Sequence, residues 1–305
     1  MLTEATMPAL PEASVRRQAW KYYFVLCAWP LYLFIVPYVY DMFGGGAVLF
    51  IIFPGVYLCT WLSFFVHETW HKSTPNIPHT LFYHLFSWML LTDPQLYGLL
   101  HPLHHAQVNS WEDAEFHPFG DIQPRYLKIL SNLVEIVLGM IYLMAAYTIV
   151  VPRHPKCQRQ YRAWKFLLSI VIWGSYLGGI GYMSHRVFGV SASHIGLAYL
   201  ISYWLGTVMV HHSQLVEHGN LIVTGDWNTR NLRSRNLKDT GLCEKLFLWL
   251  THGDAREHVL HHTLPNVYTR PLPRRVPMPD NAVYITLRDY GKIVGAMLMG
   301  RESSF

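Results

Sequence analysis

The chain has 305 residues, of which 51% are hydrophobic and only 14% are charged. A soluble domain carries about 25% charged residues, so this composition excludes an ordinary soluble protein. The net charge of +5 is gathered in segments that flank apolar runs, which favours contact with lipid headgroups or an acidic protein partner and argues against nucleic-acid binding.

Apolar runs of membrane-spanning length occur at four places in the chain. They cover residues 22–40, 47–66, 166–183 and 193–210. The first run follows a polar segment and lacks a small-residue cleavage site, so we expect it to stay in the protein as an anchor. A fifth run, 130–151, is interrupted by Glu135.

Five full crossings would separate the histidine-rich segments that precede the third run from those that follow the last run. The segment 153–165 carries five basic residues, which is typical of a cytoplasmic loop. We therefore predict that run 130–151 is re-entrant or lies at the interface, which leaves four spans. An extra half-crossing at 85–100, broken at Asp93-Pro94, is the alternative.

The expected fold is an all-α, multi-pass membrane bundle of one domain with a histidine-rich cytoplasmic cap. Its expected parts are a first helical hairpin (22–66), a part that carries HETWH and HPLHH (67–128), a second helical hairpin (166–210) and the cap, which carries EHVLHH (211–275). The bacterial inner membrane is the expected location, with the endoplasmic reticulum as the alternative.

Histidines form four clusters along the chain. HETWH carries two, HPLHH carries three, LVEHG carries one and EHVLHH carries three. They are His67, His71, His101, His104, His105, His218, His258, His261 and His262. Residues three and four apart share a face of a helix, so each cluster can direct its rings at one point. Nine imidazoles exceed the three or four ligands of one zinc ion and indicate two metal ions.

HETWH also satisfies the H-E-x-x-H pattern of zinc peptidases, with Glu68 as the general base. A peptidase needs one further ligand and has no use for two H-x-x-H-H clusters, so the sequence favours an oxidase. A metal transporter is a third class, but its histidines would lie inside the spans and these mostly flank them.

Polar residues beside the clusters have predicted supporting roles. Carboxylates can accept the remote N–H of a metal-binding ring and fix its tautomer, and the candidates are Glu68, Asp113, Asp254 and Glu257. Gln214 lies four residues before His218 and is a candidate weak ligand or water-binding group. A basic stretch is predicted to hold an acidic headgroup, a carrier phosphate or an electron donor through Arg230, Arg233 and Arg235.

HETWH, HPLHH and EHVLHH are called the first, second and third histidine box below. The three boxes, His218 and the apolar runs together resemble the membrane fatty acid desaturase/hydroxylase superfamily. HETWHKS and LVEHGN resemble the alkane-hydroxylase branch, whereas TRNLRSRN followed by DAREHVLHH is similar to bacterial fatty acid desaturases. The resemblance covers about residues 22–273. It implies a di-iron site held by the nine histidines, with a tunnel for an acyl or alkyl chain. Gln214 stands where members of the superfamily often have asparagine.

The function that follows is an O2-dependent oxidation of an unactivated C–H bond in a lipid chain. We favour desaturation over hydroxylation, decarboxylation or ketolation on the same site. Glycines 178, 179 and 181 lie within an apolar run, where helix packing explains them, and we find no flavin or dinucleotide motif. Electrons are therefore expected from a separate ferredoxin-, rubredoxin- or cytochrome-type partner.

Overall fold

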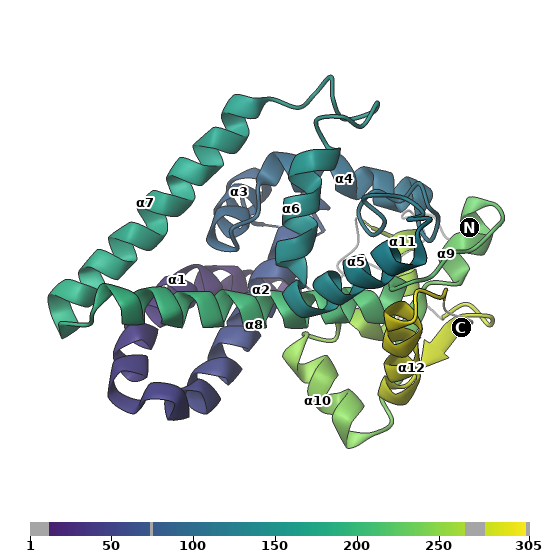
Figure 1. The fold of residues 1–305 in the computed structure, drawn as a ribbon. Helices are drawn as coiled ribbons and strands as arrows, with labels where there is room; N and C mark the ends of the chain where they lie inside the picture. Colours follow the sequence, from purple (N-terminus) through teal and green to yellow (C-terminus); the bar gives the residue numbers. More distant parts are fainter. Residues whose placement is uncertain (1–11, 74–75, 266–277, 303–305) are drawn as a thin grey trace.

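A computed structural model describes residues 12–73, 76–265 and 278–302 of the chain. It is mostly helical, as predicted (Figure 1). The helices are α1 (Glu12–Phe43), α2 (Ala47–Trp70), α3 (His79–Met89), α4 (Pro94–Gln107), α5 (Arg125–Leu138), α6 (Met140–Val150), α7 (Ala163–Phe188), α8 (Ala192–His218), α9 (Trp227–Leu232), α10 (Leu242–Leu250), α11 (His258–Thr263) and α12 (Leu287–Leu298). One small element was not predicted, a parallel pair of three-residue strands, β1 (Arg235–Leu237) and β2 (Val283–Ile285).

Among the described residues, three helices are long and apolar enough to cross a membrane. They are Ala19–Gly46, which includes most of α1, then α7 and α8. The second predicted span forms most of α2, but the side chains of residues 47–52 lie outside the described part. The candidate span α7 exposes apolar side chains such as Leu167 and Val171, which suits contact with lipid tails.

The interrupted run at 130–151 forms two short helices rather than one long one. Gly139 separates α5 from α6 and has a φ of +57°, a conformation that glycine adopts without steric cost. At 14 and 11 residues, neither helix reaches the roughly 20 residues of a span. Apolar side chains, including Tyr126, Leu130 and Val137, are exposed along α5, which suits a helix lying along a membrane surface.

Helix α8 is the central element and packs against α1, α2, α5, α6 and α7. Helices α7 and α8 meet at one end and diverge toward the other (Figure 1). The main apolar core lies where α1, α2, α3 and α8 meet, around Trp29, Phe65 and Phe86. The C-terminal end of α8 reaches into the cap, where Leu215 and Val216 join a second core with α12 and the strands.

Candidate metal centre

The nine predicted histidines lie on or directly after four helices that come together at one end of the bundle. His67 lies in the last turn of α2, and His71 follows that helix directly. The second box occupies the C-terminal half of α4, His218 is the last residue of α8, and the third box forms most of α11.

The second box is placed by the start of α4. Asp93 accepts a hydrogen bond from the backbone N–H of Leu96, and Pro94 occupies the first helical position. Both features favour a helix start, because a capping side chain satisfies one free N–H and proline has none to satisfy. Pro102, within the second box, lies inside α4.

The imidazoles gather into two groups. One contains His67, His71, His101, His105 and His261, and the other contains His104, His218, His258 and His262. Within each group, one ring nitrogen from every member lies within 4.8 Å of the others. The second and third boxes each contribute histidines to both groups, so the two groups lie beside one another.

The shortest approaches are between Nε2 atoms. His71 lies 2.9 Å from His101 and 3.1 Å from His105, and His258 lies 2.7 Å from His218 and 2.9 Å from His262. Nitrogens bound to one metal at about 2.1 Å lie about 3.4 Å apart in a tetrahedral site. The observed distances of 2.7–3.1 Å are somewhat shorter than this value, so the nitrogens are near enough to share one ion.

His261 shows most directly that the donor set fits a metal ion. Its side chain is buried, and neither ring nitrogen has a hydrogen-bond partner among the described residues. A buried polar atom without a partner costs about 1–3 kcal/mol. Coordination of a metal by one nitrogen removes that cost.

Residues 45–278 match the model of the family described as fatty acid desaturase. The chain belongs to the fatty acid desaturase family. The resemblance predicted from the boxes is thereby confirmed, and membership implies that this desaturase-family protein is an oxidoreductase of a family known for its use of iron. No curated protein matches the chain.

The protonation states of the rings suit metal binding in this family member. Burial lowers the pKa of His101 well below its usual value, and the neighbouring rings of His105 and His71 lower it further. Burial and adjacent imidazoles likewise lower the pKa of His258, His261 and His262. Such rings are neutral at pH 7, and neutral imidazole is the form that binds metals.

Polar side chains hold the remote Nδ1 atoms of several rings. His104 donates to Asp113 over 2.8 Å, His101 and Glu115 lie 2.9 Å apart, and His218 bonds to the side-chain oxygen of Asn109 over 2.9 Å. These contacts fix the ring so that Nε2 faces the group. Burial would lower the pKa of His104, but Asp113 outweighs it and the pKa is raised.

Asp113 was among the predicted supporting carboxylates, whereas Glu115 and Glu217 were missed. Glu217 lies 3.3 Å from Nδ1 of His258. No signal in the sequence separated these two from surface glutamates, because their partners come from other segments of the chain. Burial also raises the pKa of the Glu115 carboxyl to about 8.

The other predicted supporting residues are placed differently. Glu68 accepts a hydrogen bond from the Ser73 hydroxyl and lies 4.0 Å from Nδ1 of His67. Glu257 makes no hydrogen bond or ion pair with a histidine among the described residues, and burial raises its pKa to about 7. The Asp254 side chain lies outside the described part.

Replacing Asp113 with asparagine should lower iron affinity or activity by about 10- to 100-fold, because His104 loses its charged acceptor. Metal titration of the purified protein, with activity at saturating iron, measures the two effects separately. The matched control is Glu112→Gln, which alters the neighbouring exposed carboxylate. Equal iron affinity in both variants would contradict the role of Asp113.

Gln214 lies beside the histidines and lines a small cavity of about 50 Å³. Ring residues of both groups also line this cavity, including His101, His104, His218 and His261. The buried Oε1 atom of Gln214 has no hydrogen-bond partner in the part of the chain that the structure describes. The side chain is therefore placed to hold a water molecule or to reach a metal ion.

The three arginines predicted for docking separate in the structure. Arg233 is exposed and Arg230 is half-buried, with a guanidinium bond to the carbonyl of Ala106. Arg235 is fully buried and donates to the carbonyl of Gly219. A docking residue must be accessible, so the prediction does not fit Arg235. Its hydrogen bond to Gly219 instead stabilises the turn after α8.

Proposed function

We propose that each histidine group holds one iron ion and that the protein uses O2 to desaturate a fatty acyl or similar lipid chain. The observation that carries this proposal is the convergence of five and four buried or half-buried imidazoles from distant segments into adjacent groups. When bound, the irons would supply the reduction of O2 and the removal of hydrogen from an unactivated C–H bond.

A zinc peptidase fits the same residues less well. Its Glu68 would have to face the metal-bound water, whereas the Glu68 carboxylate bonds to Ser73. A single zinc ion would also leave most of the nine imidazoles without a role. The adjacent groups therefore support the di-iron proposal.

An apolar cavity of about 390 Å³ supports a lipid-chain substrate. It lies between α6, α7 and α8 and is lined by side chains such as Met144, Leu177 and Leu200. Leu90, Thr92 and Met140 line both this cavity and the one that contains the imidazoles. A hydrocarbon chain in the larger cavity would therefore have its reacting carbons directed toward the irons, and position in the cavity would select the carbon.

We further propose that the catalytic face lies on the cytoplasmic side of a bacterial inner membrane, with the endoplasmic reticulum as the alternative. The basic segment 153–165 supports this orientation. Arg230 and Arg233, on and beside α9, are proposed to bind an acidic headgroup or a ferredoxin-, rubredoxin- or cytochrome-type donor.

The test is purification followed by elemental analysis and a product survey. We expect about two irons per chain and, in cells that also express a donor system, oxygen-dependent appearance of unsaturated lipids by gas chromatography. An alcohol product would replace desaturation with hydroxylation on the same site. One tightly bound zinc and no oxidised lipid would overturn the proposal in favour of a peptidase.

Substitution of Met144 by tryptophan should narrow the apolar cavity and change chain-length preference. We expect at least about a 10-fold shift in the ratio of short-chain to long-chain products, since hydrophobic pockets discriminate by this order. Competition between two acyl chain lengths measures the ratio. Met183→Trp on the exposed surface of α7 is the control, and an equal shift there would contradict the assignment of the cavity.

A further inference from the structure

The proposed reaction consumes protons as well as electrons. Removing two hydrogens from a CH2–CH2 unit with O2 also takes up two electrons and two protons and yields a double bond and two water molecules. The imidazoles that surround the proposed irons are mostly buried, so protons need a route through the protein. This inference rests on the proposed function.

Glu135 and His211 form a buried pair outside both histidine groups. Glu135 lies on α5, His211 lies on α8, and Oε1 of the carboxylate is 3.0 Å from Nε2 of the ring. His211 is fully buried and Glu135 is 7% exposed. A buried ionisable pair rarely improves stability over an apolar pair of the same size, so its presence beside a catalytic centre indicates a functional role.

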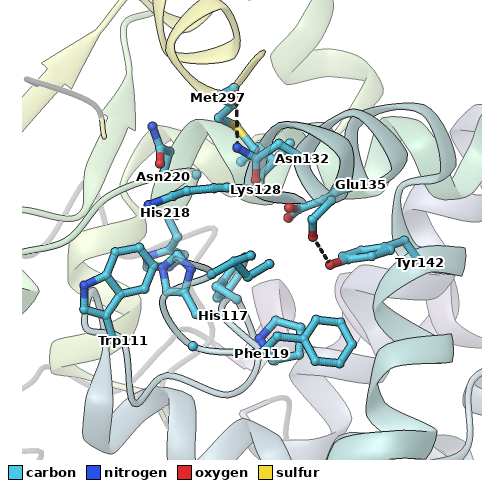
Figure 2. Close-up of a pocket in the computed structure, with 17 residues that line it drawn as sticks. Trp111, His117, Phe119, Lys128, Asn132, Glu135, Tyr142, His218, Asn220 and Met297 are labelled. Atoms are coloured by element: carbon cyan, nitrogen blue, oxygen red, sulfur yellow. Dashed lines mark hydrogen bonds between the residues drawn. The ribbon is translucent and has the colours of Figure 1, made fainter. Parts of the chain in front are cut away.

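A cavity of about 40 Å³ with both polar and apolar walls reaches Glu135 of this pair. Its lining includes Lys128, Ser131, Asn132, Glu135 and Asn220. In Figure 2, Glu135 lies on the α5 side of the cavity and His117 lies on the loop side, with Phe119 nearby. Phe119 is exposed, which places one edge of the cavity at solvent. The polar side chains on its wall can hydrogen-bond water.

His218 also borders this cavity, but it cannot accept a proton there. Its Nδ1 is bonded to Asn109, and its Nε2 lies 2.7 Å from Nε2 of His258 within a histidine group. The direct route is therefore closed, and Glu135 is the carboxylate among the residues that line the cavity.

On its other side, His211 leads toward the proposed irons. Its Nδ1 atom is buried and has no hydrogen-bond partner among the described residues, and the same holds for Oε1 of Gln214. The two residues are three apart on α8 and so are neighbours on one face. Gln214 lines the cavity that contains the imidazoles. One water molecule between the two atoms would satisfy both.

We propose that Glu135 and His211 form a proton relay from the cavity of Figure 2 to the cavity of the histidine groups. A proton from cavity water binds the Glu135 carboxylate and passes from Oε1 to Nε2 of His211. The proton on Nδ1 then leaves toward Gln214, and the ring rotates so that the freed Nδ1 faces Glu135 for the next transfer. Each cycle moves one proton and leaves both side chains in their original charge states.

Other titratable groups surround the pair and belong to the elements packed against it. They are Lys128 on α5, Tyr142 on α6, His212 on α8, Tyr290 on α12 and His117 in the preceding loop. His212 already has partners on both nitrogens, the carbonyl of Ile136 and the hydroxyl of Tyr290. It therefore provides a matched control for His211.

The test compares Glu135→Gln and His211→Gln with His212→Gln in the iron-loaded membrane protein. For the first two we expect kcat to fall by about 100-fold or more, the usual contribution of a positioned proton donor. The Michaelis constant for lipid should stay unchanged, and more O2 should be reduced to hydrogen peroxide for each double bond formed. Two irons should remain bound. His212→Gln should keep the original ratio of product to O2 consumed.

A readout that does not depend on iron is nitrogen NMR of histidine-labelled, iron-free protein. Glu135→Gln should shift the Nε2 signal of His211, whereas Glu135→Asp should restore part of both the signal and kcat. If Glu135→Gln gives too little protein, Glu135→Asp and His211→Gln are compared with His212→Gln instead. If the wild-type protein is active and the variants keep its kcat and its ratio of product to O2 consumed, the relay is overturned and the proposed function stands. If the iron-loaded wild-type protein oxidises no lipid, the proposed function itself is overturned.

Discussion

Replacing His105 with alanine should lower bound iron from two ions per chain to one and reduce product formation by more than about 100-fold, beyond the usual effect of losing a supporting residue. Nε2 of His105 lies 3.1 Å from that of His71 and 3.2 Å from that of His101, at the centre of the five-histidine group. Elemental analysis and gas chromatography of the same preparation measure both quantities.

The equivalent change in the other group is His258→Ala, which should remove the second ion and retain the first. His84→Ala is the control, because this histidine lies on α3 and outside both groups. A His105→Ala protein that retains two irons and full activity would show that the five-histidine group does not hold a metal.

Substitution of Gly139 by alanine should destabilise the protein strongly. A Cβ at this position would lie 2.6 Å from Cα of Val208 and 2.7 Å from the carbonyl oxygen of Thr207, and both are backbone atoms of α8. The φ of +57° with a ψ of −132° also costs any other residue about 1–3 kcal/mol. We expect the melting temperature to fall by at least about 5 °C.

Thermal unfolding in detergent, followed by size-exclusion chromatography, measures this loss. Gly178→Ala on α7 is the matched control, since nothing lies within 4 Å of an added Cβ there. A melting temperature for Gly139→Ala equal to that of Gly178→Ala would show that α5 and α6 do not approach α8 as closely as the structure indicates.

Local patterns in the sequence were sufficient to find the histidines. Spacings of three and four residues placed the rings of each box on one helical face, and the structure brings all nine together. The division into two groups was not predictable, because His261 belongs with the first box while its neighbours His258 and His262 belong with His218. That division depends on how α11 packs, which no local pattern encodes.

Residues that act through tertiary contacts were harder to predict. Glu115 reaches His101 from a loop, and Arg235 is buried beneath the turn after α8. Both residue types are usually exposed, so burial could not be inferred from residue type. The break in run 130–151 was signalled by Glu135, yet the helix ends at Gly139, four residues later.

The short helix α11 has a consequence for how the protein matures. It contains six residues, too few for a stable helix in isolation, and its attachment to the strands includes a bond from the Val259 backbone to Asn236. Since its three rings are divided between both groups, neither group is complete until this segment has been synthesised and has folded back onto α2, α4 and α8. Under the proposed function, iron would therefore be bound late in biogenesis, after this segment has folded.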